Sequence, residues 1–195
     1  MKRWIAALAG VLFCVLAPAQ PAPSSSSTAI FAGGCFWCIE ADFEKLPGVI
    51  SVESGYTGGQ TENPTYKQVG AGGTGHTEAV RVVYDPSKVS YDQLVDYFWR
   101  HIDPTVKDQQ FCDVGSQYRS GIYYQGEAQK RVAEASKKAL ESRFAHIYTE
   151  IAPAAKFFPA EDYHQDYYKK NPVRYKYYRF SCGRDARVAE VWGKS

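Results

Sequence analysis

Two adjacent glycines separate two apolar stretches near the start of the chain, and this junction limits how the neighbouring residues can fold. Residues 30–32 form a short apolar run, and residues 35–43 place apolar side chains at helical spacing. Gly33 and Gly34 supply the backbone freedom that a tight turn between them needs. The pattern predicts a strand, a glycine turn and a helix that begins at Cys35.

Further helices and strands are predicted along the chain without strict alternation. Ser90 and Gln93 have the spacing of a capping box at the start of one helix, and an Ala-, Lys- and Glu-rich run at 127–144 predicts another. This mixture favours an α+β fold. The predicted strands cover residues 49–56, 78–84, 120–124 and 146–151, and loops are expected at 57–77 and 104–117.

The first 28 residues differ in composition from the rest of the chain. Lys2 and Arg3 precede an apolar run at 4–16 that ends in Ala-Pro-Ala, which predicts a signal peptide over 1–19. The run is shorter than the ~20 residues of a membrane span. Residues 20–28, rich in Pro and Ser, are expected to form a flexible leader before a single domain at 29–195. We expect export, with the periplasm as the destination.

The charge of the chain argues against two classes of partner. Loss of the signal peptide would remove two of the 23 basic residues and leave 21 to balance 21 acidic ones. A near-neutral chain without a basic block has no electrostatic reason to bind nucleic acid or, once the signal peptide is cleaved, a membrane surface. We expect a monomer. The four histidines show no metal-ligand spacing and are expected to be structural or to lie at the surface.

Cys35 and Cys38 form a C-x-x-C pair at the predicted helix start. A helix N-terminus and a neighbouring thiol both favour a thiolate, so a reactive dithiol is predicted here. Two alternatives are small buried core cysteines and half of a zinc site. Zinc is disfavoured because Cys112 and Cys182 stand alone in the sequence and supply no second pair.

The stretch GGCFWCIEADFEKLPGV around these cysteines resembles the signature of the peptide methionine sulfoxide reductase A family. The likeness continues in order through GYTGG, NPTY, GHTEAVRVVYDP, DVGSQYRS, AEDYHQ and KNP, and it covers residues 30–172. The resemblance implies a ferredoxin-like two-layer α/β sandwich with a mixed sheet and a long irregular C-terminal tail. It also implies reduction of methionine sulfoxide, the S epimer, free or in proteins, with neither a metal nor an organic cofactor.

The resemblance assigns a role to each residue that matches a motif. Cys35 would attack the sulfoxide sulfur, and Glu78 would donate a proton to its oxygen. A carboxyl group packed against aromatic rings is desolvated, which raises its pKa and suits this role. Tyr66 and Tyr118 would hydrogen-bond the oxygen, whereas the remaining three positions would bind substrate: Phe36 and Trp37 around the methyl group, and Asp113 orienting the bound residue.

Attack leaves Cys35 as a sulfenic acid, which a second thiol must resolve before a thioredoxin-like donor reduces the disulfide. Many members of the family have glycine where Cys38 stands, and they place a recycling cysteine in the tail shortly after KNP. Cys182, ten residues beyond Pro172, is the favoured resolving thiol by its tail position. Cys38 is a close second because it lies beside Cys35, and Cys112 could relay.

Two rival functions use the same cysteines. A general dithiol-disulfide oxidoreductase would act on protein disulfides through Cys35 and Cys38, and a non-catalytic binding module would use its cysteines as structural bridges. Neither rival needs a buried acid. Glu78 therefore discriminates between them and a sulfoxide reductase.

Overall fold

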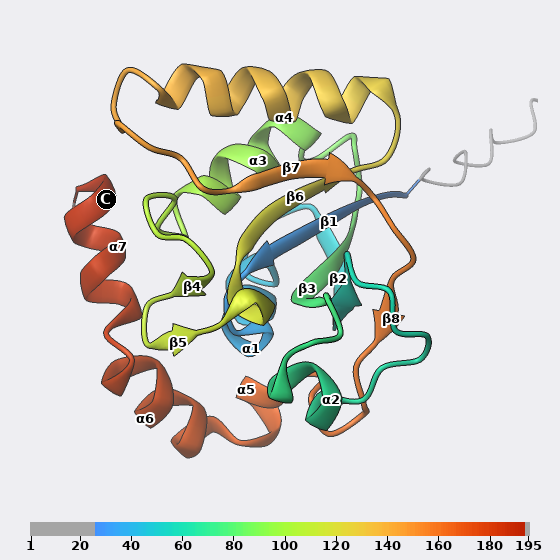
Figure 1. The fold of residues 1–195 in the computed structure, drawn as a ribbon. Helices are drawn as coiled ribbons and strands as arrows, with labels where there is room; N and C mark the ends of the chain where they lie inside the picture. Colours follow the sequence, from blue (N-terminus) through green and yellow to red (C-terminus); the bar gives the residue numbers. More distant parts are fainter. Residues whose placement is uncertain (1–25, 194–195) are drawn as a thin grey trace, which may run out of the picture.

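A mixed six-stranded sheet forms the centre of the computed structural model, which describes residues 26–193 (Figure 1). Its strands are β1 (Ser27–Gly33), β2 (Val49–Thr57), β3 (Thr77–Tyr84), β6 (Ser120–Tyr124), β7 (Glu150–Pro153) and β8 (Phe158–Pro159). They lie in the order β7-β6-β1-β3-β2-β8, and all neighbours pair antiparallel except β6 and β7, which are parallel. The predicted α+β class and mixed sheet are confirmed.

The helices and a small second sheet complete the fold. The second sheet pairs β4 (Gln109–Gln110) with β5 (Asp113–Val114), and a 3-10 turn follows at Ser116–Tyr118. The helices are α1 (Phe36–Phe43), α2 (Tyr66–Ala71), α3 (Tyr91–Trp99), α4 (Glu127–Leu140), α5 (Tyr167–Lys170), α6 (Pro172–Ser181) and α7 (Arg184–Trp192).

The alternating side chains of β1 divide the core between the two faces of the sheet. Phe31 faces the helices, where its ring stacks on Phe43 of α1 at 5.0 Å and on Phe98 of α3 at 5.1 Å. Ile30 faces the other side, in a smaller apolar cluster that includes Phe157. Burial on both faces explains why β1 is apolar from Ala29 to Ala32, as expected for a central strand.

The glycine turn after β1 fixes where α1 begins. Gly34 has φ +82°, and a Cβ atom there would lie 2.6 Å from Cβ of Gln110. A Cβ on Gly33 would lie 2.5 Å from Cδ1 of Ile39. Both positions therefore exclude a side chain. The turn places Cys35 at the N-terminus of α1, which confirms the predicted strand, turn and helix.

Several boundaries differ from those predicted. The loop expected at 57–77 contains α2, which begins with a capping box between Thr65 and Gln68. The last predicted strand, 146–151, is displaced to β7, and α4 ends at Leu140 rather than at 144. The capping box of Ser90 and Gln93 is confirmed at the start of α3.

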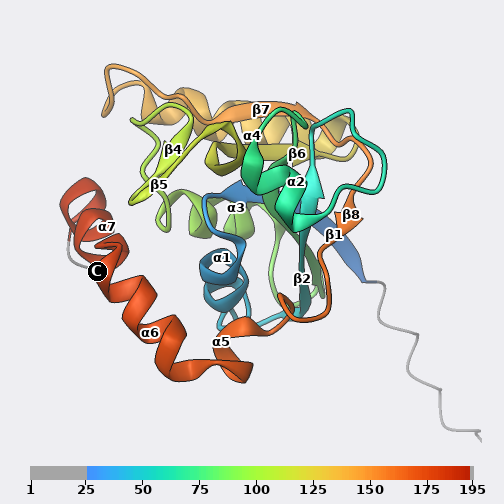
Figure 2. The same ribbon diagram turned by 60° about the horizontal axis from the view of Figure 1, so that its bottom comes forward.

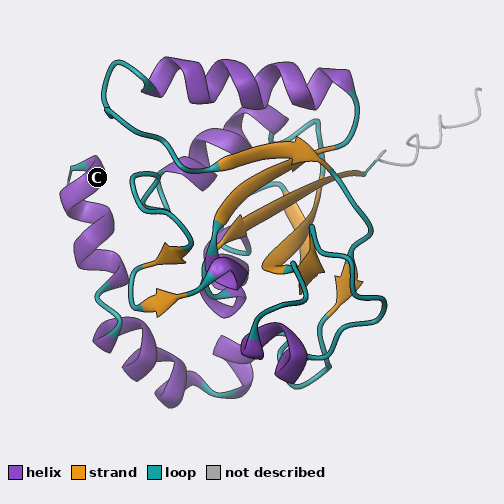
Figure 3. Cartoon of the chain, viewed as in Figure 1, coloured by secondary structure: helices purple, strands orange, loops and turns teal. Residues whose placement is uncertain are grey.

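The prediction of an irregular C-terminal tail is wrong over residues 167–192, which form three helices (Figure 3). Pro172 stands in the first turn of α6, where its missing N–H costs nothing. Gly183, in the left-handed conformation, separates α6 from α7. Figure 2 shows α5, α6 and α7 following one another along the outside of α1 and the β4–β5 ribbon.

The described part of the chain begins just before β1. Ser27 and Thr28 pair with β3, so the strand starts two residues inside the predicted leader. The predicted signal peptide and the rest of the leader up to residue 25 lie outside the described residues. Within residues 26–193, no helix combines the length and the apolar character needed to cross a bilayer.

Candidate active site

A small pocket of about 60 Å³ lies where the start of α1 meets residues from β3, β5, α2 and α6. Its lining includes all seven residues that were predicted for catalysis or substrate binding, although they are spread over more than 80 positions of the sequence. One further residue, Tyr178, was not predicted. The eight lining residues are Cys35, Phe36, Trp37, Tyr66, Glu78, Asp113, Tyr118 and Tyr178.

Glu78 is a buried carboxyl group on β3, with 2% of its surface exposed. Its Oε2 atom accepts a hydrogen bond of 2.9 Å from the backbone N–H of Phe36. Burial and, to a smaller extent, the charge of Asp113 raise the pKa of Glu78 to about 8, against the opposing effect of that hydrogen bond. Glu78 therefore holds its proton at neutral pH and can act as a general acid.

The pKa values of the two free cysteines shift in opposite directions, which the sequence did not predict. Burial raises the pKa of Cys35 well above its ordinary value, and the neighbouring Cys38 and Glu78 raise it further. The N–H of Phe36, which could have stabilised a thiolate at the start of α1, is bonded to Glu78 instead. A hydrogen bond from Cys35 lowers the pKa of Cys38 to about 7. The prediction of a thiolate at Cys35, based on its place at the helix start, is thus wrong for this state of the protein.

Tyr66 and Tyr118 face the same pocket from α2 and from the 3-10 turn. Burial raises the pKa of Tyr66 to about 12 and that of Tyr118 further still. Both therefore keep their hydroxyl protons at neutral pH. Within residues 26–193 neither hydroxyl group has a hydrogen-bond partner, so both are free to donate to an oxygen atom in the pocket.

The aromatic side of the pocket is held by a histidine from the AEDYHQ motif. The indole Nε1–H of Trp37 donates to Nδ1 of His164 at 3.0 Å, and the Trp37 ring stacks on Tyr167 at 3.7 Å. The His164 ring also lies 5.0 Å from Phe36 and 4.3 Å from Tyr66. Burial lowers the pKa of His164, so the neutral ring can accept this bond. His164 was expected to be structural or to lie at the surface. It is structural in a specific way, because it holds Trp37 in the wall of the pocket.

Tyr178 belongs to none of the sequence motifs, but it lines the pocket. Its hydroxyl group donates to Oδ2 of Asp113 at 2.5 Å. This bond joins α6 to β5 beside Cys35. No local signal in the sequence distinguishes Tyr178 from its neighbour Tyr177, because the difference depends on which side of α6 faces the pocket.

The remaining two cysteines are bonded to each other. Cys112 beside β5 and Cys182 at the end of α6 form a disulfide, whereas Cys35 and Cys38 are free thiols. Cys112, Asp113 and Cys182 lie close enough together to suggest a metal site, but sulfurs in a disulfide are not thiolate ligands. In this state of the protein Cys182, the favoured resolving residue, is not a free thiol, whereas Cys38 is.

Comparison with known proteins identifies the family to which this site belongs. The sequence profile of the family described as "Peptide methionine sulfoxide reductase" matches residues 27–195. "Peptide methionine sulfoxide reductase MsrA 2" of Caulobacter vibrioides is 48% identical over 197 residues, which cover 99% of this chain and 100% of the relative. "Peptide methionine sulfoxide reductase MsrA/MsrB" of Vibrio cholerae is 52% identical over 168 residues, 85% of this chain but only 44% of the relative.

The fold comparison agrees with the sequence comparison. The crystal structure of reduced Mxr1 from Saccharomyces cerevisiae matches with a TM-score of 0.73 and 31% identity, over 78% of this chain and 90% of that one. The profile match runs from β1 to the C-terminus, and the Caulobacter relative matches over its whole length. This chain belongs to the peptide methionine sulfoxide reductase family.

Proposed function

We propose that the protein reduces methionine sulfoxide, the S epimer, free or within proteins, to methionine. The observation that carries this proposal is the meeting of Cys35 with a protonated Glu78 in one pocket. Sulfoxide oxygen is a poor leaving group until it is protonated, so the reaction needs a nucleophile and an acid on the same substrate. A thiol exchange enzyme or a binding module would need no such acid.

In the first step the Cys35 sulfur attacks the sulfoxide sulfur while Glu78 donates a proton to the oxygen. Tyr66 and Tyr118 stabilise the negative charge that develops on that oxygen by hydrogen bonding. The oxygen then passes to Cys35 as the sulfur–oxygen bond of the substrate breaks, and the proton lost by the Cys35 thiol replaces the one that Glu78 gave. The products are methionine and a sulfenic acid at Cys35, so the thiol is oxidised and the sulfoxide is reduced.

In the second step Cys38 condenses with the sulfenic acid at Cys35 and releases water. Cys38 lies one helical turn from Cys35 and is free, whereas Cys182 is already bonded to Cys112. The resulting disulfide needs an external dithiol for its reduction. Mxr1 of Saccharomyces cerevisiae forms a complex with Trx2, and a thioredoxin-like protein is the donor that we propose here.

The decisive experiment measures methionine release from each sulfoxide epimer with dithiothreitol as reductant. We expect the wild type to act on the S epimer, Cys35→Ser to be inactive, and Glu78→Gln to be slowed by roughly 10² to 10⁴. Glu53→Gln is the matched control because Glu53 lies on the adjacent strand and pairs with Arg81, outside the pocket. Undiminished turnover by Cys35→Ser would exclude this mechanism.

The finer fold class is also a proposal. The core elements occur in the chain order β1-α1-β2-β3-α3-β6, and the corresponding strands have the spatial order β6-β1-β3-β2. This arrangement supports a ferredoxin-like sandwich, the class that the sequence resemblance implied. The strands β7 and β8 extend it at its two edges.

For the N-terminus we propose a cleaved signal peptide over 1–19, a short leader, and export of a monomeric catalytic domain to the periplasm. The charged pair Lys2 and Arg3, the apolar run and the Ala-Pro-Ala site support this assignment. Mass spectrometry of the protein from a periplasmic fraction should give a chain that begins at Gln20. A chain that keeps Met1 and stays in the cytoplasm would exclude it.

A further inference from the structure

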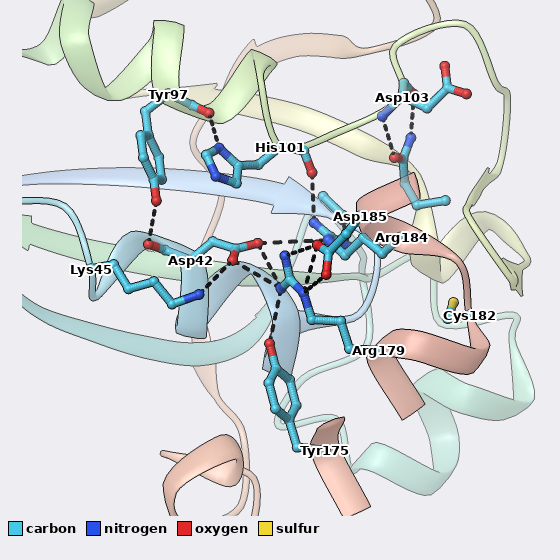
Figure 4. Close-up of polar contacts among 12 residues, drawn as sticks. Asp42, Lys45, Tyr97, His101, Asp103, Tyr175, Arg179, Cys182, Arg184 and Asp185 are labelled. Atoms are coloured by element: carbon cyan, nitrogen blue, oxygen red, sulfur yellow. Dashed lines mark hydrogen bonds and ion pairs between the residues drawn. The ribbon is translucent and has the colours of Figure 1, made fainter. Parts of the chain in front are cut away.

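A cluster of buried charges lies against α1 on the side of the C-terminal helices (Figure 4). Asp42 of α1 accepts at Oδ2 from Nη1 of Arg179 on α6 at 3.1 Å, and the same Oδ2 lies 3.8 Å from Nε of Arg184 on α7. The exposed fractions of the Asp42, Arg179 and Arg184 side chains are 3%, 15% and 2%. Three elements thus bring two guanidinium groups to one carboxylate.

Arg184 is held in place by backbone carbonyl groups rather than by a carboxylate of its own. Its Nη1 donates to the carbonyl oxygen of Gly33 at 3.2 Å, and its Nη2 donates to that of His101 at 2.9 Å. Its guanidinium carbon lies 4.5 Å from the ring centre of Phe111. Within residues 26–193 its buried Nε has no hydrogen-bond partner. A guanidinium so deeply buried is costly unless negative charge lies nearby.

The buried charges of the cluster do not cancel. Arg179 also pairs with Asp185 at 2.6 Å, but 69% of the Asp185 side chain is exposed, so water screens that charge. Lys45, the other partner of Asp42, is 61% exposed. Of the three buried side chains that form the cluster, two are cations and one is an anion. A second negative group near α1 would therefore be stabilised.

Cys38 is in position to be that group. It precedes Asp42 by four residues on α1, so the two side chains lie on the same face of the helix. It packs in a buried cluster with Tyr175, whose hydroxyl group accepts from Nη1 of Arg179 at 3.0 Å. The guanidinium group of Arg179 thus contacts both Tyr175, which packs against Cys38, and Asp42, which lies one turn from Cys38 on α1.

We propose that Arg179 and Arg184 are positioning residues that stabilise the thiolate of Cys38 for its attack on the sulfenic acid at Cys35. This role rests on the proposed function, in which Cys38 is the resolving thiol. The pKa of Cys38 agrees with it, because the hydrogen bond from Cys35 and the charges of Arg184 and Arg179 together lower it to about 7, against burial. The titratable and charged groups around Cys38 are Cys35, Asp42, Glu78, Tyr167, Tyr175, Tyr178, Arg179 and Arg184.

The attack is a balanced exchange. The Cys38 thiolate supplies the electron pair for the new sulfur–sulfur bond, and the sulfur–oxygen bond of the Cys35 sulfenic acid breaks. The departing oxygen takes a proton from the Glu78 carboxyl group and leaves as water. Because the thiolate and not the thiol is the nucleophile, the rate of this step follows the fraction of Cys38 that is ionised.

The test is a single turnover of the reduced protein with an equimolar amount of the S sulfoxide between pH 5.5 and 9. Acid quenching and mass spectrometry follow both methionine release and formation of the Cys35–Cys38 disulfide. In Arg184→Met and Arg179→Met we expect disulfide formation at pH 7 to slow by about fivefold, as a rise of about one unit in the Cys38 pKa would give. Methionine release should change little, and Arg184→Lys should restore part of the rate.

Arg187→Met is the matched control, because Arg187 also lies on α7 but pairs with Asp103 and Glu190. Its pH profile should match that of the wild type. An unchanged profile for disulfide formation in folded Arg179→Met and Arg184→Met would overturn the proposal. If the wild type released no methionine, the proposed function would be wrong, and this proposal with it. If methionine were released but the new disulfide did not contain Cys38, the assignment of the resolving thiol would be wrong, and this proposal would again fail.

A second measurement needs no arginine variant and so does not depend on how such variants fold. The ultraviolet absorbance of thiolate is titrated in Cys35→Ser and in Cys35→Ser/Cys38→Ser, and the difference reports Cys38 alone. We expect a midpoint clearly below the ~8.5 of an ordinary cysteine. A midpoint at or above that value would overturn the proposal.

Discussion

Glu78, Cys35 and Cys38 each bind a proton with an affinity that their surroundings decide. Glu78 and Cys35 are both buried and both hold their protons more firmly than they would in water. Cys38 loses its proton more easily because Cys35 donates a hydrogen bond to it. The resting site therefore contains an acid for the sulfoxide oxygen and an anionic sulfur beside the nucleophile.

This distribution predicts how activity depends on pH. The pKa of Glu78 is raised to about 8, so its acid form persists through neutral pH and is lost above that value. The rate of methionine release in a single turnover should therefore fall as the pH rises beyond about 8. Quenched-flow measurement from pH 6 to 10 checks this, and a rate that keeps rising to pH 10 would show that Glu78 is not the proton donor.

The same raised pKa predicts a change in stability. Between about pH 4.5 and 8 the folded protein holds a proton on Glu78 that the unfolded chain has released, so folding becomes less favourable as the pH rises through this window. Glu78→Gln removes that effect. The free energy of unfolding of Glu78→Gln relative to wild type should rise from pH 5 to pH 8 in denaturant titrations. A constant difference would contradict the pKa of Glu78.

His164 offers a test of how the aromatic wall is held. Replacing it by Leu removes the acceptor for Trp37 and leaves a part-buried indole N–H unpaired, at a cost of about 1–3 kcal/mol. Because Trp37 would lose its fixed orientation, KM for the sulfoxide should rise more than kcat falls. His164→Gln, which can still accept, should retain most of the affinity. Equal kinetics for the Leu and Gln variants would argue against this positioning role.

Among the C-terminal helices, α6 is the one that supplies a residue to the pocket. Within one turn and a half it supplies Tyr178 to Asp113, Arg179 to Asp42, and Cys182 to the disulfide. The bond to Cys112 fixes α6 to the β4–β5 ribbon directly beside the pocket. The helix thus contributes Tyr178 to the wall of the pocket.

The disulfide should contribute to stability more than to chemistry. It joins cysteines 70 residues apart, so removing it in Cys112→Ser/Cys182→Ser should lower the free energy of unfolding by up to about 4 kcal/mol. The first methionine should still be released, and Cys35 and Cys38 should still form their disulfide. Loss of that second disulfide in the double variant would show that Cys112 or Cys182 takes part in the redox relay.

For the molecule as a whole, the last helix, α7, is hydrogen-bonded to segments from much earlier in the chain. Arg184 reaches the carbonyl group that ends β1, and Trp192 donates from Nε1 to the carbonyl oxygen of Ile102 at 2.8 Å. Both contacts cross from α7 to segments more than 80 residues earlier. The tail is therefore part of the domain rather than an appendage.

Deleting residues 184–195 tests this integration. The deletion leaves the buried carbonyl groups of Gly33 and His101 without Arg184, which should cost on the order of 3 kcal/mol and lower Tm by at least about 6 °C. Calorimetry measures the change, and Glu190→Gln on the exposed side of α7 serves as the control. A shortened chain with the same Tm as the wild type would show that α7 is dispensable for the fold.

The sequence alone determined the features that depend on near neighbours. The glycine pair and the capping pattern of Ser90 and Gln93 act within four residues, so they predicted where α1 and α3 begin. The motifs named all but one of the pocket residues. Thr65 and Gln68 carry the same capping signal at the start of α2, within the segment that was expected to be a loop.

Only the tertiary structure decided what depends on distant segments. The pairing of Cys112 with Cys182, the side of α6 on which Tyr178 lies, and the burial of Arg184 all require the chain to return across the molecule. The protonation state of the cysteines also depends on the tertiary structure. Local sequence favours a thiolate at Cys35, but desolvation and the neighbouring groups set proton affinity, and both exist only after the core has closed.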